Sequence, residues 1–309
     1  MTNDSTSPSD DPGQARDARA EPGTNPLVSI VIPAYNNADY LADTMISVLG
    51  QSYRNLEVIV SDHASTDGTW AVMESFQSDP RVTLLRTEGG GGALRNWNRV
   101  SQAATGSLIK LVCGDDLLYP TIVEDQVRAL LEEPTAVLAA SARDIVDADG
   151  APVIKNRGLA GLTGVHDGTT AVRKTITQGT NIFGEPGCVL MRRSALEDIG
   201  WWDSRWPYLI DEATYCRVLL LGRFVGVPGS LAGFRISAGQ WSVRLMNDQA
   251  KQATGFHDWM AQSRPDVVSA TDRVIGNVRA RMLAQVRRLA YAWLGRRMSK
   301  SVNTDARTS

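Results

Sequence analysis

Two adjacent carboxylates, Asp115 and Asp116, follow an apolar run at residues 107–112 that is typical of a buried strand. A buried charge without a partner is costly, so we expect something to receive these side chains. Mg²⁺ and Mn²⁺ prefer oxygen ligands and usually share them with substrate phosphates. The pair therefore predicts a divalent-cation site. The alternative is that one aspartate caps the helix expected from about Thr121.

The segments around this pair predict a sheet that gathers polar side chains at one edge. Strand-like runs alternate with segments of helical spacing, and this alternation predicts an α/β fold with a mostly parallel central sheet and helices on both faces. In such sheets ligands bind beyond the carboxyl ends of the strands. Tyr35, Asn36 and Asp62 also follow predicted strands. The strands are expected at 28–33, 56–62, 82–86 and 107–112, and the helices at 38–49, 69–76 and 93–103.

Composition limits the class of protein. The chain has 309 residues, 43% of them hydrophobic, which is enough for a sizeable core. No apolar run is long enough to cross a bilayer, and the N-terminus is polar, so we expect a cytoplasmic protein. A net charge of -2 argues against nucleic-acid binding. Three scattered cysteines indicate neither a disulfide framework nor a zinc site.

Three stretches carry a resemblance to a known family. They read SIVIPAYNNADYL (29–41), QSYRNLEVIVSDHASTDGT (51–69) and RNWNRVSQAATGSLIKLVCGDD (95–116). In this order they resemble the family 2 glycosyltransferases, inverting enzymes of GT-A fold that use nucleotide-sugar donors. The resemblance implies a nucleotide site formed by Pro33, Tyr35, Asp62 and Arg95, and a Mn²⁺ or Mg²⁺ ion on Asp115 and Asp116.

The chain departs from the family's pattern at three positions. Cys113 replaces the first acid of the metal motif, and His63 and Ser237 stand where an Asp or Asn and a His are common. A thiol is a poor ligand for Mg²⁺, so weaker metal dependence is expected. These departures motivate an alternative, a catalytically impaired nucleotide-sugar binding module. A nucleotidyltransferase is disfavoured, because no Gly-rich basic signature follows the first strand.

The second half of the chain is expected to bind the acceptor. GEPGCVLMRRSALEDIGWWD (184–203) and PYLIDEATYCRVLLLG (207–222) also resemble family segments, which puts Asp211 at the catalytic-base position with Glu212 as its substitute. The alternative for Asp211 is a helix N-cap. The resemblance also suggests acceptor or diphosphate contacts. The candidates are Glu185, Trp202 and Arg235, and the neighbouring Trp201, Trp206 and Trp241 belong either to the acceptor site or to the core.

Residues 271–300 carry eight basic side chains and one acid, Asp272. Apolar residues recur there every three or four positions, which predicts an amphipathic helix. The default interpretation is that this stripe packs on the protein's own domain. The alternative is contact with an anionic membrane, with a carbohydrate or lipid-linked sugar acceptor at the inner face of the plasma membrane. The stripe consists of Ile275, Val278, Met282, Val286, Leu289 and Trp293.

The expected organisation has four parts. A disordered acidic tail is expected at 1–25 and a short tail at 301–309. A GT-A domain at 26–245 would comprise a nucleotide-binding half, 26–130, and an acceptor half, 131–245. A helical extension at 246–300 would follow the domain.

Overall fold

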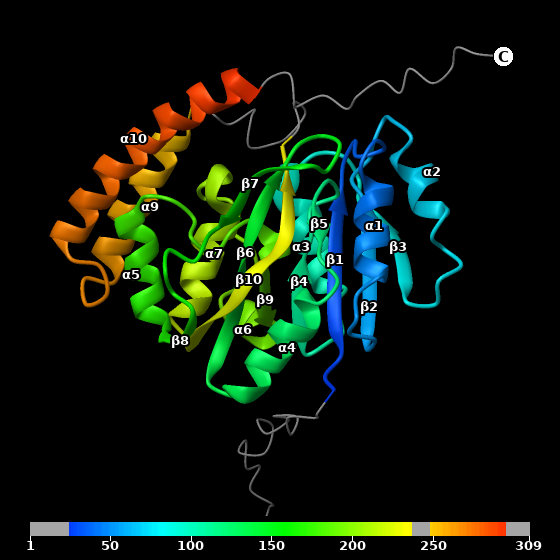
Figure 1. Ribbon diagram of the computed structural model, residues 1–309, viewed down its shortest axis with the longest axis horizontal. Coiled ribbons are helices and arrows are strands. Elements are labelled where there is room, and N and C mark those ends of the chain that lie inside the picture. Colours follow the sequence, from blue (N-terminus) through cyan, green and yellow to red (C-terminus); the bar gives the residue numbers. More distant parts are fainter. Residues whose placement is uncertain (1–24, 237–247, 295–309) are drawn as a thin grey trace, which may run out of the picture.

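The computed structural model describes residues 25–236 and 248–294, which form one large sheet with surrounding helices (Figure 1). Residues 1–24 of the tail predicted at 1–25, the tail predicted at 301–309, and Ser237 and Trp241 lie outside the described residues.

Four parallel strands build the first half of the sheet, in the spatial order β3-β2-β1-β4. Successive residues of β1 and β2 are buried although they point to opposite faces, so both faces are covered. The predicted α/β alternation is present here. The strands are β1 (Val28–Ala34), β2 (Leu56–Asp62), β3 (Val82–Arg86) and β4 (Leu108–Leu111), and the helices between them are α1 (Leu41–Leu49), α2 (Thr69–Glu74) and α3 (Gly92–Gln102).

The second half of the sheet is mixed rather than parallel. β9 (Val189–Arg192) lies between β4 and β6 (Ala136–Val146) and is antiparallel to both, whereas β10 (Arg223–Arg235) is parallel to β6. Six of the ten strands in the described residues therefore share one direction. The other antiparallel strands are β5 (Leu117–Leu118), β7 (Pro152–Arg157) and β8 (Gly164–Asp167).

Helices and short turns connect the strands of this half. α4 (Ile122–Glu132) packs on β6 and β10, and α7 (Ile210–Leu219) packs on β6. Two 3₁₀ turns, η1 (Pro186–Cys188) and η2 (Pro207–Leu209), each begin with a proline, whose preset φ suits the first position of a helix. The remaining helices are α5 (Gly168–Gln178) and α6 (Arg193–Asp198).

In the described residues two helices follow the sheet, as predicted for the C-terminal end of the fold. α9 (Gln249–Ser263) and α10 (Ala270–Leu294) pack against each other, and α10 also packs on α5 (Figure 1). None of the helices in the described residues is both long and apolar enough to span a bilayer. The predicted domain boundary at 245 lies outside the described residues.

Candidate active site

Three of the four residues predicted to bind a nucleotide, Pro33, Tyr35 and Asp62, lie at the carboxyl ends of β1 and β2. The register places Ala34 opposite Asp62, so Tyr35 follows directly beside it. Tyr35 is 49% exposed, and its ring centre lies 6.0 Å from that of His63. Asp62 is buried and accepts the backbone N–H of Ser65 at 3.2 Å. A planar base could stack on Tyr35 and donate to this carboxylate.

A glycine brings the metal-binding candidates to the same edge. A Cβ on Gly114 would lie only 2.8 Å from Oδ1 of Asn37, so the chain just before Asp115 packs tightly against the loop after β1. The same oxygen of Asn37 accepts the backbone N–H of Tyr35 at 2.8 Å. The chain before the predicted metal residues and the loop that carries Tyr35 therefore pack closely through Gly114 and Asn37.

Arg95 lies beside this edge in an open hollow of about 600 Å³. Its guanidinium contacts Glu88 at 3.0 Å and donates to the carbonyl of Gly89 at 3.2 Å. Thr87 also lines the hollow, and its backbone N–H donates to the carbonyl of Asp62 at 2.8 Å. The hollow is basic and adjoins Asp62, but it does not include the metal-binding candidates. Its lining is Arg86, Thr87, Glu88, Arg95, Asn98, Arg99 and Gln102.

Four carboxylates lie close enough to Cys113 to raise the pKa of its thiol. Burial raises the pKa of its thiol well above the usual value, and the negative charges of the four acids raise it further. The thiol therefore stays protonated, which makes it a poor metal ligand. The acids come from distant parts of the chain and include both metal-binding candidates and the proposed base: Asp115, Asp116, Glu185 and Asp211.

Asp211 is held in the first turn of α7 with a perturbed pKa. Asn181 donates to its Oδ2 at 2.9 Å, and the backbone N–H of Glu212 donates to its Oδ1 at 2.8 Å. Burial raises the pKa of Asp211 to about 7, and the charge of Glu185 adds to the rise although both hydrogen bonds oppose it. A carboxylate with a pKa near neutrality suits a general base. The helix begins after Leu209, so Asp211 does not occupy the predicted N-cap position.

Tyr215 lies one turn after Asp211 on the same side of α7. Its hydroxyl is fully buried and has no hydrogen-bond partner in the described structure. Burial raises the pKa of Tyr215 well above its usual value, and the charge of Asp211 raises it further. An unpaired buried hydroxyl is costly and is consistent with a polar group binding nearby.

The two adjacent aspartates differ in their surroundings. Asp115 is partly exposed, whereas Asp116 is buried and its Oδ1 accepts the backbone N–H of Arg235 at 3.2 Å. Burial raises the pKa of Asp116 well above its usual range, and the charges of Asp115 and Glu185 add to this. α4 begins after Thr121 without a side-chain cap, so the interpretation of either aspartate as its cap is wrong. Asp115 is the more accessible of the two predicted metal-binding residues.

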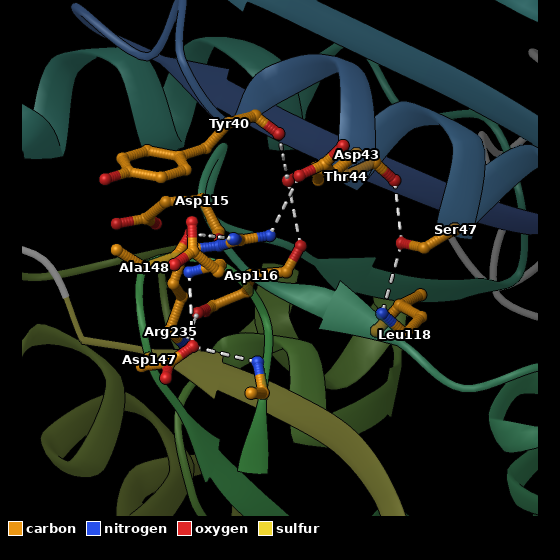
Figure 2. A network of polar contacts seen from close by, with 12 residues as sticks. Tyr40, Asp43, Thr44, Ser47, Asp115, Asp116, Leu118, Asp147, Ala148 and Arg235 are labelled. Carbon is orange, nitrogen blue, oxygen red and sulfur yellow. Dashed lines mark hydrogen bonds and ion pairs between the residues drawn. The ribbon is translucent and has the colours of Figure 1, made fainter. Parts of the chain in front are cut away.

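The prediction that Arg235 contacts the diphosphate is wrong, because its side chain is buried and engaged with the protein. Its side chain is 1% exposed and every nitrogen of its guanidinium contacts the protein (Figure 2). Nε donates to the carbonyl of Asp115 at 2.9 Å, and Nη1 donates to that of Ala148 at 2.5 Å. Nη2 lies 3.2 Å from a carboxylate oxygen of Asp43, and the ring of Tyr40 covers the guanidinium at 4.9 Å. Arg235 thus holds the loop that carries Asp115.

Trp202 and Glu212 also differ from their predicted roles. Trp202 is 3% exposed, donates from Nε1 to Ser101 at 2.8 Å and packs edge-on against Trp97, so it belongs to the core and does not contact an acceptor. Glu212 is 2% exposed. Burial raises its pKa to about 8, with a further rise from Asp211 that Arg287 opposes. Enclosed in this way, Glu212 does not present its carboxylate to a substrate.

Glu185 stays a candidate for substrate contact. Its carboxylate pairs with Arg143 at 2.5 Å and retains 25% of its side-chain exposure. It also borders a narrow crevice with Asp116 and Phe234, beside the end of β10. The pair places one positive and one negative group next to the proposed base.

Three residues that support the site were not predicted. Asn181 orients Asp211, Arg143 pairs with Glu185, and Lys110 donates from its buried Nζ to the carbonyls of Gly187 and Val189 at 2.9 and 3.0 Å. Burial lowers the pKa of Lys110 to about 7. A lysine within an apolar strand was a visible signal, whereas Asn181 and Arg143 belong to no motif.

The described residues do not form a closed metal cage. Nowhere in residues 25–236 and 248–294 do three or more His, Cys, Asp or Glu side chains gather to hold an ion. The hard oxygens of Asp115, and the second oxygen of Asp116, nevertheless fit Mg²⁺ or Mn²⁺, because these ions commonly complete their coordination with substrate phosphates and water. The residues present therefore suit a cation that arrives with a diphosphate.

Solved structures show the same fold at low sequence identity. The chain superposes on S. aureus TarS 1-349 in complex with UDP-GlcNAc with a TM-score of 0.61 and 16% identity, over 76% of this chain and 66% of that one. It superposes on the mannosyltransferase PcManGT from Pyrobaculum calidifontis, in complex with GDP-Man and Mn²⁺, with a TM-score of 0.57 and 17% identity, over 91% and 78%. The predicted GT-A fold is confirmed.

Comparison with known sequences identifies the family of the chain. The uncharacterized protein MT1568 of Mycobacterium tuberculosis is 29% identical over 76% of this chain and 75% of its own length. The putative teichuronic acid biosynthesis glycosyltransferase TuaG of Bacillus subtilis is 32% identical, but the match spans 42% of this chain and 52% of TuaG. The model of "Glycosyl transferase family 2" matches residues 29–200, more than half of the chain. The chain belongs to glycosyl transferase family 2, which confirms the predicted enzyme class.

Proposed function

We propose that the protein transfers a sugar from a nucleotide-diphosphate donor to a hydroxyl acceptor with inversion at the anomeric carbon, in the synthesis of a cell-surface polysaccharide or glycolipid. The observation that supports this proposal is that Asp115 and Asp211 both lie close enough to Cys113 for their charges to raise the pKa of its thiol, while the pKa of Asp211 itself is raised to about 7. One acid suits the leaving diphosphate with its cation, and the other suits an incoming alcohol.

The donor would lie along the edge from Asp62 to Asp115. Asp62 accepts a ring N–H of the base, Tyr35 stacks on it beside Pro33, and Arg95 adds positive charge from the adjoining hollow. Solved structures of the same fold contain UDP-GlcNAc and GDP-Man, which supports a nucleotide-sugar donor without selecting the base.

The chemical step follows from the position of Asp211. The acceptor oxygen forms a bond to the anomeric carbon while the bond from that carbon to the diphosphate oxygen breaks. The proton of the alcohol passes to Asp211, and the electron pair leaves with the nucleoside diphosphate. Attack opposite the leaving group inverts the anomeric centre. Asn181 keeps the carboxylate oriented through its 2.9 Å hydrogen bond.

Asp115, with Asp116 beside it, would hold Mn²⁺ or Mg²⁺. When bound, the cation neutralises the charge of the leaving diphosphate. Cys113 lies where the family often has another acid, and its protonated thiol contributes no charge to the site. We therefore expect weaker metal affinity than an additional carboxylate would provide.

The alternative is an impaired nucleotide-sugar binding module. His63 and Cys113 favour it, because neither side chain offers a carboxylate. His63 instead contacts the carbonyl of Gly90 at 2.9 Å, so it fixes the loop before α3.

The test measures release of nucleoside diphosphate from a panel of UDP, GDP and dTDP sugars with Mn²⁺. We expect turnover with at least one donor, and a loss of about 100-fold or more in Asp211→Asn, since general bases contribute at least this much. Asp198→Asn, at an exposed position at the end of α6, is the matched control and retains activity. Nucleotide binding without turnover for every donor would instead establish the impaired module.

A further inference from the structure

An exposed apolar stripe runs along α10. Val274, Val278, Met282 and Val286 follow one another at intervals of four residues, with Ile275 beside them, and their exposed fractions range from 40 to 63%. Residues four apart on a helix lie on the same face. These five make up half of the exposed large apolar side chains among the described residues. Contiguous exposed apolar surface of this kind marks an interaction site.

The opposite face of α10 packs on the protein through small residues. A Cβ on Gly276 would lie 2.3 Å from the carbonyl oxygen of Ile176 in α5, and one on Gly179 would lie 2.5 Å from the backbone nitrogen of Ala280. Ala280 and Ala284 are buried on this face. The interpretation that the stripe packs on the domain is therefore wrong for Ile275, Val278, Met282 and Val286. Leu289 and Trp293 lie beyond the described side chains.

Arginines flank the stripe on both sides. At 100° per residue, Arg281 lies at one border of the stripe and Arg279 at the other, and both are exposed. The single acid of α10, Asp272, is 5% exposed and pairs with Arg173 at 2.8 Å. The exposed face of the helix in the described residues is thus apolar at its centre, positive at its borders and free of acid.

We propose that α10 lies flat on an anionic lipid bilayer, with the stripe at the boundary of headgroups and acyl chains and the flanking arginines on lipid phosphates. The apolar centre of this face suits the acyl-chain boundary, and its basic borders suit the anionic headgroups. A second copy of the chain fits less well, because pairing two such stripes would place arginines against arginines. The stripe from Val274 to Val286 extends for about 18 Å along α10, enough for a flat contact between this part of the helix and the bilayer.

The same helix reaches the proposed active site. Arg287, on the packed side, donates to the hydroxyl of Thr180 at 2.7 Å. Thr180 precedes Asn181, which holds Asp211. In Figure 1 the red end of α10 rises toward the side where β10 ends. A bilayer under α10 would therefore hold a lipid-linked acceptor close to the proposed base. Only this last statement rests on the proposed function; binding to the bilayer does not.

Vesicle sedimentation of the full chain tests the proposal. The vesicles contain either phosphatidylcholine alone or phosphatidylcholine with phosphatidylglycerol. We expect binding to the anionic vesicles, at least about tenfold weaker binding to the neutral ones, and a similar loss in Arg279→Gln/Arg281→Gln. No sedimentation of the unmodified chain with anionic vesicles would overturn the proposal.

A matched pair of variants tests the stripe. Val278→Asp/Met282→Asp replaces side chains that are 50 and 63% exposed, and Leu221→Asp/Ile46→Asp replaces side chains that are 51 and 63% exposed on other helices or turns. The first variant should lose at least about tenfold in affinity for anionic vesicles and the second should retain it. Equal losses would contradict a role for this face. Thermal melts of both variants check folding.

Two further outcomes separate the alternatives. A dimer in sedimentation velocity that Val278→Asp/Met282→Asp converts to a monomer, without lipid binding by the original chain, would assign the stripe to a second copy and overturn the membrane proposal. Nucleotide release from the donor with a water-soluble acceptor should be unchanged in Val278→Asp/Met282→Asp. Loss of vesicle binding with intact sugar transfer would thus distinguish the membrane surface from the catalytic site.

Discussion

The pKa values of individual side chains at the site depend on burial and on the charges nearby. Asp211, Glu185 and Asp115 lie near the thiol of Cys113, and the pKa of Asp211 rises chiefly because it is removed from water. Asn181 supplies a hydrogen bond that partly offsets this cost. The same acid would be an ordinary carboxylate on the surface. Its proposed function as a base depends on this partial enclosure, which leaves it available to an acceptor yet holds its pKa near neutrality.

The pH dependence of kcat/KM should reveal the raised pKa of Asp211. Asp211 accepts a proton only in its ionised form, so kcat/KM should rise with pH up to about 7 and then level. In Asp211→Asn this ascending limb should disappear along with most of the rate. Asp198→Asn should keep the limb. An unchanged ascending limb in the Asp211→Asn variant would assign the titration to another group.

Two glycines allow the helices α5 and α10 to approach each other closely. α5 and α10 meet where Gly179 and Gly276 leave room for the opposing backbone. A larger residue on either helix would separate them, and the apolar stripe of α10 would not then remain on the outer side in the same orientation. Small residues therefore decide which face of α10 is exposed.

Gly276→Ala should reverse the usual effect of this substitution. In a helix interior, Ala is normally more stabilising than Gly by about 1 kcal/mol. At this position the new Cβ would lie 2.3 Å from a backbone oxygen, so we expect a loss of about 1 to 3 kcal/mol in the free energy of unfolding instead. Urea denaturation and hydrogen exchange of α10 amides measure it.

Gly255→Ala in α9 is the control for this change. Its Cβ would lie 3.3 Å from the indole nitrogen of Trp206, a side chain that can move slightly. It should therefore cost less than Gly276→Ala or stabilise the protein. Equal losses in both variants would mean that the contact with α5 is not the cause.

The whole molecule joins two halves around the site, and Arg235 is a principal link between them. Asp43 and Asp115 belong to the first half, whereas Ala148 and Arg235 belong to the second. The carboxylates whose charges raise the pKa of Cys113 come from both halves as well. The geometry of the site therefore depends on how the halves are held together.

Removal of Arg235 should cost far more than removal of its ion pair. Arg235→Ala leaves buried carbonyls without donors, and we expect a loss of about 3 kcal/mol or more in the free energy of unfolding. Asp43→Asn should cost less than about 1 kcal/mol, because the side chain of Asp43 is 48% exposed. Urea denaturation compares the two variants. Similar losses would show that the ion pair, rather than the contacts to carbonyls, holds the halves.

The sequence by itself determined the strands of the first half and the acids at their ends. Apolar runs of strand length, each followed by a polar residue, define where β1, β2 and β4 end, because both faces of a covered sheet must be apolar. Asp62, Asp115 and Asp211 also lie in motifs that a single chain displays.

The tertiary structure alone decided which polar and aromatic side chains are enclosed. Trp202 and Arg235 are buried because segments distant in sequence cover them, and no local pattern records this. The spacing of apolar residues in α10 predicts that they share one face of the helix, but it does not tell whether that face packs on the protein or stays exposed. The face with Gly276 packs on the protein because α5 approaches it closely, and this contact joins residues about 100 positions apart in the sequence.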